Sequence, residues 1–84
     1  MTRKKFDKDT ALKIQKGDIQ GRIVTDHGEN VQIFDGQLRG ELPVYGIIKY
    51  NEYDAIMQWT NDGKRNLPRL NTSSIYDLYI EIDE

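Results

Sequence analysis

The 84-residue sequence contains no cysteine. This absence excludes disulfide bonds, zinc–thiolate sites and a cysteine nucleophile together. No apolar run approaches the roughly 20 residues that a membrane-spanning helix needs, and no apolar stretch follows the basic N-terminal residues. We therefore expect a cytoplasmic protein that has no signal peptide and makes no membrane contact.

Residues suited to catalysis are also scarce. His27 is the only histidine, and it lies in a polar turn between Asp26 and Glu29, a grouping that is common in solvated turns. Nothing places Ser73 or Ser74 beside it, as a Ser–His–Asp arrangement would require. The glycine-containing segments lack the strand–loop–helix setting of a phosphate-binding loop. We predict no catalytic residue, no metal site and no cofactor, and hence no enzymatic activity.

A long helical period is absent, whereas short segments of alternating apolar and polar residues recur between glycine-containing turns. These segments are 12–15, 19–23, 31–34, 42–50, 55–60 and 75–82. They predict a mainly β protein, a small SH3-like and mostly antiparallel barrel of five to six strands, partly open, with a short N-terminal helical turn. Closure would protect the strand edges. The alternative is an α+β open sheet with the N-terminal helix across one face.

The length predicts one domain over residues 1–84. We expect residues 1–5 to be a flexible arm, followed by a turn or so of helix that begins at the N-cap Asp7. A chain of this size buries only about 60% of its unfolded surface, so the core is small. The phase of alternation in each strand predicts the inward residues. They are Ile14, Ile23, Val31, Ile33, Val44, Ile48, Met57, Trp59, Leu78 and Ile80.

The only tryptophan, Trp59, precedes the hairpin signal Asp62-Gly63. It shares a strand face with Ala55 and Met57, which favours a place in the core. The other interpretation keeps the ring partly exposed beside Lys64 and Arg65, as a stacking platform.

The net charge of −2 is unevenly distributed. Basic residues gather in residues 1–16 and again at 64–70, whereas residues 77–84 carry four acidic residues and no basic one. The basic segments either converge into one patch or are separate solvated parts of the surface.

Tyr45 and Tyr79 fall opposite the core faces, where a tyrosine either pairs across strands or marks an interface. The candidate interaction residues are Tyr45, Tyr79, Lys64, Arg65 and Arg69.

Several short motifs occur in a characteristic order. They are Lys4 with Phe6-Asp7, then Arg22-Ile23, Leu42-Pro43-Val44 with Gly46, Trp59-Thr60 with Asp62-Gly63, and Asp77-Leu78. This order resembles short uncharacterised proteins that phages, prophages and other mobile elements of gut bacteria encode. The chain departs from that pattern by a shorter helical segment after Phe6 and a longer region over residues 26–41. The resemblance implies a small β-rich accessory protein and carries no known activity or site residue.

Two classes of function follow from these observations. The first is a protein-interaction module whose edge strand or tyrosine face binds a protein partner. The alternative is a nucleic-acid-binding small barrel that uses Lys4, Lys5, Lys64, Arg65 and Arg69 for phosphates and an aromatic ring for stacking. We favour the first, because the acidic C-terminal segment and the pI of about 5.3 oppose a polyanion. Any binding to nucleic acid is then weak. The sequence identifies neither the partner nor the oligomeric state.

Overall fold

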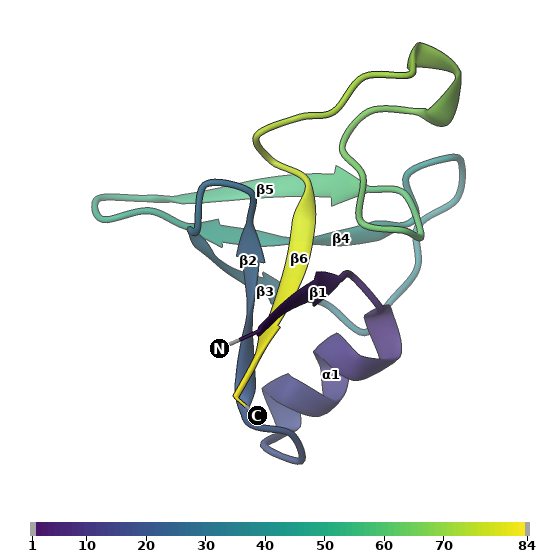
Figure 1. Ribbon diagram of the computed structural model, residues 1–84. Coiled ribbons are helices and arrows are strands. Elements are labelled where there is room, and N and C mark those ends of the chain that lie inside the picture. The colour runs from purple at the N-terminus through teal and green to yellow at the C-terminus, as the bar shows by residue number, and fades with distance from the viewer. Residues whose placement is uncertain (1, 84) are drawn as a thin grey trace.

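The computed structural model describes residues 2–83, which form one six-stranded antiparallel sheet with a helix packed against it (Figure 1). The elements in chain order are β1 (Thr2–Lys5), α1 (Lys8–Lys16), β2 (Gly21–Thr25), β3 (Asn30–Ile33), β4 (Val44–Lys49), β5 (Asp54–Trp59), the 3₁₀ helix η1 (Pro68–Leu70) and β6 (Leu78–Ile82). Their order in the sheet is β1-β6-β2-β3-β4-β5. The two ends of the sheet are therefore β1 and β5.

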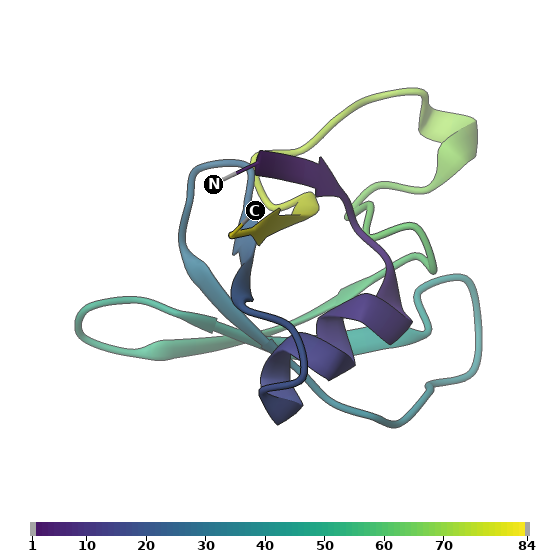
Figure 2. The same ribbon diagram turned by 60° about the horizontal axis from the view of Figure 1, so that its bottom comes forward.

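The sheet bends sharply between β2 and β3. These strands share the single ladder pair Val24–Asn30, whereas the other neighbours pair over four to six residues. The strands β1, β6 and β2 consequently run across β3, β4 and β5, and α1 packs against β2 and β3 (Figures 1 and 2). The predicted mainly β, mostly antiparallel and partly open barrel is confirmed.

The helix is longer than predicted. Asp7 does cap it, because its Oδ2 accepts a hydrogen bond from the Thr10 backbone N–H at 3.2 Å. The segment that was expected to continue as a strand, residues 12–15, instead remains helical as far as Lys16. Gly17, which lies between the predicted strand segments 12–15 and 19–23, ends the helix in the left-handed conformation at φ 87°.

The alternation of Leu12 and Ile14 with polar residues wrongly indicated a strand. Both residues belong to the helix, and both pack only partly against the core.

The side chain of Gln15 fixes the helix to the sheet. Its amide donates to the Ile33 carbonyl at 2.7 Å and accepts from the Ile33 N–H at 2.5 Å. One side chain thus satisfies both backbone groups at the end of β3.

The prediction of a flexible N-terminal arm is wrong for residues 2–5. They form the edge strand β1, which pairs antiparallel with β6 from Thr2–Ile82 to Lys5–Tyr79. All four side chains are exposed, so the strand has no buried face that an alternating pattern could reveal. Residue 1 lies outside the described residues.

The core agrees closely with the predicted inward set. Eight of the predicted residues are buried, while Ile14 and Met57 are partly buried against them. Trp59 is 0% exposed, and its indole N–H donates to the Tyr76 carbonyl at 2.8 Å. The core interpretation of Trp59 is therefore confirmed, and the stacking-platform interpretation is wrong. The alternation did not identify three further buried apolar residues, Phe6, Ala11 and Val24.

The turn at Asp62-Gly63 connects the two halves of the barrel. Gly63 has φ 80°, and a Cβ there would lie only 2.7 Å from the Phe6 Cβ. The Gly63 carbonyl accepts from the Leu78 N–H at 2.8 Å, at the start of β6. A left-handed glycine is thus required both by the turn and by the close approach of Phe6.

The helices within residues 2–83 include none with the length and apolar composition of a membrane span.

Candidate functional site

The two edge strands of the sheet differ in how they are protected. The β1 edge consists of Thr2 followed by three cations, a composition that opposes pairing with another strand. The centre of β5 carries no charge, and Ile56 in its middle is 78% exposed. An edge strand whose centre is uncharged, apolar and exposed is a typical site for the addition of another strand.

The backbone of β5 presents free hydrogen-bonding groups along this edge. The Tyr50 N–H donates to the Tyr53 carbonyl at 3.0 Å, which fixes the phase of the β4–β5 ladder. In an antiparallel pair the residues alternate between bonding to the partner strand and facing away from it. Asp54, Ile56 and Gln58 are therefore the β5 residues whose N–H and C=O groups point away from β4.

The outer face of this part of the sheet carries a group of apolar side chains among polar ones. Ile47 in β4 lies directly opposite Ile56, and Tyr45 lies opposite Gln58. The Tyr45 ring lies 5.2 Å from the Phe34 ring, centroid to centroid. Tyr45, which was predicted to lie opposite the core, is half-buried on this face. The row from Phe34 to Ile56 forms an apolar surface that ends at the open edge.

Two grooves meet at Gln58, near the C-terminal end of β5. One has a volume of about 290 Å³ and is lined by Leu38, Tyr45, Ile56, Met57, Gln58 and Arg65. The other has a volume of about 240 Å³ and is lined by Arg39, Glu41, Leu42, Gln58 and Leu67. Loops that precede β4 and follow β5 supply the charged residues, so each groove joins chain segments that are distant in sequence.

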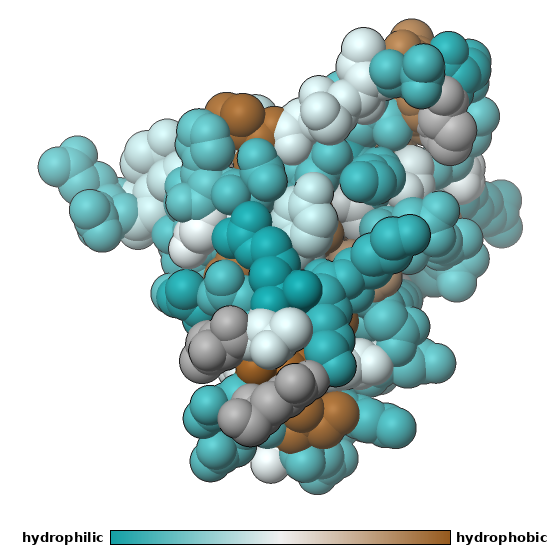
Figure 3. Space-filling view, in the orientation of Figure 1, coloured by the Kyte–Doolittle hydropathy of each residue, from teal (hydrophilic) through white to brown (hydrophobic). Residues whose placement is uncertain are grey.

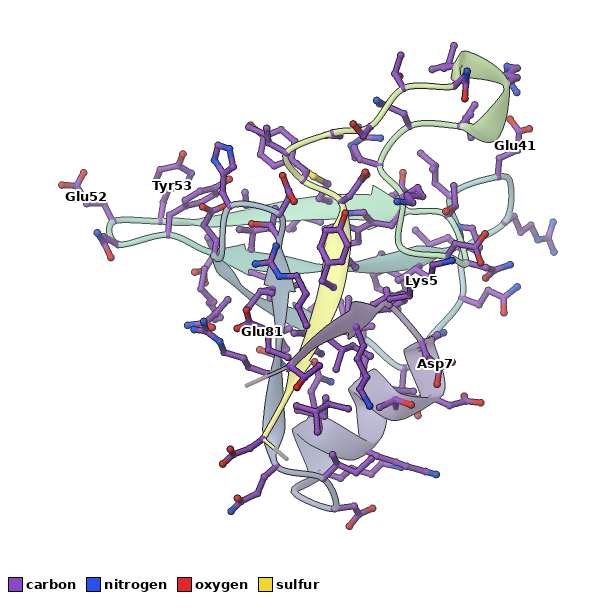
Figure 4. All side chains as sticks on the ribbon, viewed as in Figure 1. Lys5, Asp7, Glu41, Glu52, Tyr53 and Glu81 are labelled. Carbon is purple, nitrogen blue, oxygen red and sulfur yellow. The ribbon has the colours of Figure 1, made fainter. Side chains whose placement is uncertain are left out.

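The two arginines of these grooves, Arg39 and Arg65, are available to a ligand. Neither guanidinium forms a hydrogen bond or an ion pair with any of residues 2–83. The backbone N–H of Arg65 is held by the Asp77 carboxylate at 2.8 Å, which fixes the base of its side chain. Arg69 differs, because it forms an ion pair with Glu41 at 3.0 Å. Figure 4 shows Glu41 near η1, the helix that carries Arg69.

The tip of the β4–β5 hairpin projects from the rest of the molecule and carries Glu52 and Tyr53 (Figure 4). The Tyr53 ring is stacked on Tyr50, with 4.9 Å between their centroids. Burial raises the pKa of the Tyr50 hydroxyl. Lys49 forms an ion pair with Asp54 at 3.3 Å at the base of this hairpin. Glu52 is therefore the carboxylate without an ion pair among the described residues of the tip, whereas the opposite end of β5 lies beside Arg39 and Arg65.

The two basic segments of the sequence converge in part, around Tyr79. The guanidinium carbon of Arg3 lies 5.1 Å from the centre of the Tyr79 ring, and the ammonium of Lys64 lies 5.8 Å from it. A cavity of about 310 Å³ lies beside the ring and is lined by Lys5, Phe6, Asp62, Lys64, Leu78 and Tyr79. Arg65 and Arg69 belong to the β5 end of the molecule instead.

Carboxylates neutralise much of this basic cluster. Lys64 lies 3.8 Å from the buried Asp77, and Arg3 lies 3.7 Å from Asp26 and 3.6 Å from Glu81. The hydrogen bond from Arg22 lowers the pKa of the Glu81 carboxyl, which keeps it ionised at neutral pH. The face in Figure 3 is accordingly hydrophilic, with small and separate hydrophobic patches.

The turn that contains His27 offers no metal site. Glu29 is engaged by Thr25, whose hydroxyl donates to its Oε1 at 2.6 Å. Among residues 2–83, no group of three or more histidine, aspartate or glutamate side chains is placed to hold a metal ion. A shallow depression beside His27 is lined mainly by Gly28, Glu29, Asn30, Lys49 and Tyr50.

No known protein family, curated protein or solved structure matches this chain. The site therefore rests on the geometry of β5. Sequence reasoning did not single out Ile56, Gln58 or Arg39. The alternation that places Met57 inward also places Ile56 outward, but only the strand order shows that β5 is an edge.

Proposed function

We propose that the protein is a small, non-catalytic interaction module of the cytoplasm that binds an extended protein segment by strand addition at β5. The observation that carries this proposal is Ile56, which is 78% exposed at the uncharged centre of the edge strand β5. A bound segment would pair its backbone with Asp54, Ile56 and Gln58, and its side chains would contact the apolar outer face. Backbone pairing supplies affinity in such complexes, and pockets for alternate side chains supply specificity.

The resemblance to short accessory proteins of phages and mobile elements stays a prediction. A compact module that acts by binding is consistent with it, since those proteins carry no known activity. The candidate residues Tyr45 and Arg65 lie at the proposed surface. Tyr79 and Lys64 lie at the basic cluster around β1 and β6.

The Ile56→Lys variant tests the proposed function. A lysine at the centre of β5 is expected to block strand addition, because a charge on an edge strand opposes pairing. Immobilised wild-type protein is incubated with nuclease-treated lysate of the producing cell, and retained proteins are compared with those on the variant. We expect a protein partner that wild-type protein retains and Ile56→Lys loses.

Ile75→Lys is the matched control, since Ile75 is also an exposed isoleucine, at 45%, but lies outside β5. It should retain the same partner. Hydrogen exchange of the complex should slow at the Ile56 and Gln58 amides, which β4 leaves free. Equal retention by wild-type and Ile56→Lys proteins, or unchanged exchange at these amides, would contradict strand addition at β5.

The basic cluster around Tyr79 favours nucleic-acid binding as a second candidate function, because two basic segments do meet there. Since Asp77, Asp26 and Glu81 offset these cations, we expect only weak binding, with Kd no tighter than about 10⁻⁵ M at physiological salt. Fluorescence anisotropy with labelled single- and double-stranded oligonucleotides at several salt concentrations measures it. Sub-micromolar binding that Lys5→Glu with Lys64→Glu abolishes would favour nucleic acid over protein as the partner, since both residues line the cavity beside Tyr79.

A further inference from the structure

The strand β5 is complementary to itself when two copies are placed antiparallel. We infer that a second copy of this chain is a partner of the β5 edge, and that the two β5 strands pair about a two-fold axis at Ile56. This inference rests on the proposed function, because it uses the same open edge. It identifies the bound segment as β5 of the second copy.

The backbone register supports this symmetric arrangement. Pairing about Ile56 places Ile56 opposite Ile56 of the second copy, and Asp54 opposite Gln58 of the second copy. Asp54, Ile56 and Gln58 are the residues whose backbone groups face away from β4. Each of these three residues therefore has an N–H and a C=O that β4 leaves free, as the hydrogen-bonded pairs of an antiparallel ladder require.

The apolar surface is also continued by this register. Directly opposite residues share a face of the sheet, so the exposed Ile56 of one copy would cover that of the other. Ile47, which lies opposite Ile56 within each chain, extends the row on both sides. The symmetric pair would thus cover the exposed apolar centre of each edge.

Charge complementarity selects the second copy rather than an arbitrary extended segment. The register brings Asp54 of the second copy beside Gln58, where the two grooves with the unpaired Arg39 and Arg65 meet. Glu52, two residues before Asp54, lies at the tip of the same hairpin (Figure 4). Asp54 forms an ion pair with Lys49 of its own chain at 3.3 Å, whereas Glu52 forms none with any of residues 2–83. The two carboxylates at this end of each β5 would lie beside Arg39 and Arg65 of the other copy.

The other sheet edge does not offer the same contact. Pairing β1 with β1 of a second copy would bring exposed Arg3, Lys4 and Lys5 together, and like charges facing each other oppose strand pairing. Pairing β1 with β5 would be a head-to-tail contact that leaves a free edge at each end. Only the β5–β5 contact closes into a symmetric dimer.

Sedimentation equilibrium of the whole protein tests this inference from about 10 µM to about 1 mM. We expect wild-type protein to form a dimer in this range, and Ile56→Lys to weaken it by at least about tenfold, because two lysines would face each other. The control Ile75→Lys should dimerise like wild-type protein. In the dimer, the amides of Ile56 and Gln58 should exchange more slowly than in monomeric Ile56→Lys protein.

Charge exchange identifies the register. Arg65→Glu alone and Asp54→Lys alone should each weaken the dimer, because each places like charges at both junctions. An equimolar mixture of the two variants should regain dimerisation, because every junction then joins opposite charges. A mixture that associates no better than the separate variants would overturn the antiparallel β5–β5 arrangement.

The result can be separated from that of the proposed function. Wild-type protein that is monomeric up to about 1 mM overturns the second-copy inference. If that monomeric protein still retains a lysate protein that Ile56→Lys loses, strand addition at β5 stands with a different partner. If it retains none, the proposed function fails as well.

Discussion

Replacing Trp59 by alanine is expected to lower the free energy of unfolding by about 3–5 kcal/mol, as for a large aromatic residue in a packed core. The side chain is completely buried and lies among Ile33, Val44 and Ile48 in the core cluster. The substitution also leaves the Tyr76 carbonyl without its indole donor. Urea denaturation followed by far-ultraviolet circular dichroism measures the change, since the variant contains no tryptophan to report fluorescence.

Two controls separate packing from the hydrogen bond. Trp59→Phe keeps most of the apolar volume and removes the indole N–H, so it should lose less stability than Trp59→Ala. Tyr53→Ala removes an aromatic ring that is 64% exposed at the hairpin tip, and it should change stability by less than about 1 kcal/mol. A loss of under about 1 kcal/mol for Trp59→Ala would show that the ring is not part of the core.

The sequence predicts most of the strands because alternation records which side of a strand is buried. This works for β3, β4, β5 and β6, whose alternate residues face the core. It fails for β2, where Ile23, Val24 and Thr25 are consecutive and all buried. A strand that is covered on both faces shows no alternation.

The helix was underestimated for a related reason. Residues 8–16 contain few apolar side chains, and only Ala11 among them is fully buried. The contact that fixes this helix to the sheet is made by Gln15, a polar residue whose role depends on the position of β3. Hydrophobic periodicity cannot report a polar anchor of this kind.

The candidate site depends on strand order, which a single sequence does not contain. Ile56 is exposed because β5 has no neighbour beyond β4. Arg39 and Arg65 line two grooves that both include Gln58, because loops that precede β4 and follow β5 lie at the same end of the sheet. In the same way, Arg3 and Lys64 meet at Tyr79 because β1 pairs with β6 and the 60–64 turn packs against the start of β6.

The buried carboxylate of Asp77 holds the segment that places Arg65 at this site. It is 1% exposed and accepts hydrogen bonds from the backbone N–H of Arg65 at 2.8 Å and of Ser74 at 3.1 Å. Lys64 lies 3.8 Å from it. Asp77 thus joins the segment that follows the Asp62-Gly63 turn to the segment that enters β6.

Asp77→Ala is therefore expected to lower the free energy of unfolding by about 3 kcal/mol, since each hydrogen bond to a charged group contributes roughly 1.5–3 kcal/mol. Removing the carboxylate also leaves two backbone donors unpaired. Asp77→Asn keeps one acceptor oxygen and should lose about half as much. Lys64→Met removes an ion pair and a contact with the Tyr79 ring, both made by a half-exposed side chain, and it should lose less than about 1 kcal/mol.

Urea denaturation of the three variants ranks these contributions, and hydrogen exchange locates them. In Asp77→Ala, the Arg65 and Ser74 amides should exchange faster, whereas amides in the β2–β6 pair should change only with global stability. Because Arg65 loses its anchor, the same variant should also weaken binding at the β5 edge. If Asp77→Ala loses no more stability than Lys64→Met, the two backbone hydrogen bonds contribute nothing, and the position of Arg65 is determined by other contacts.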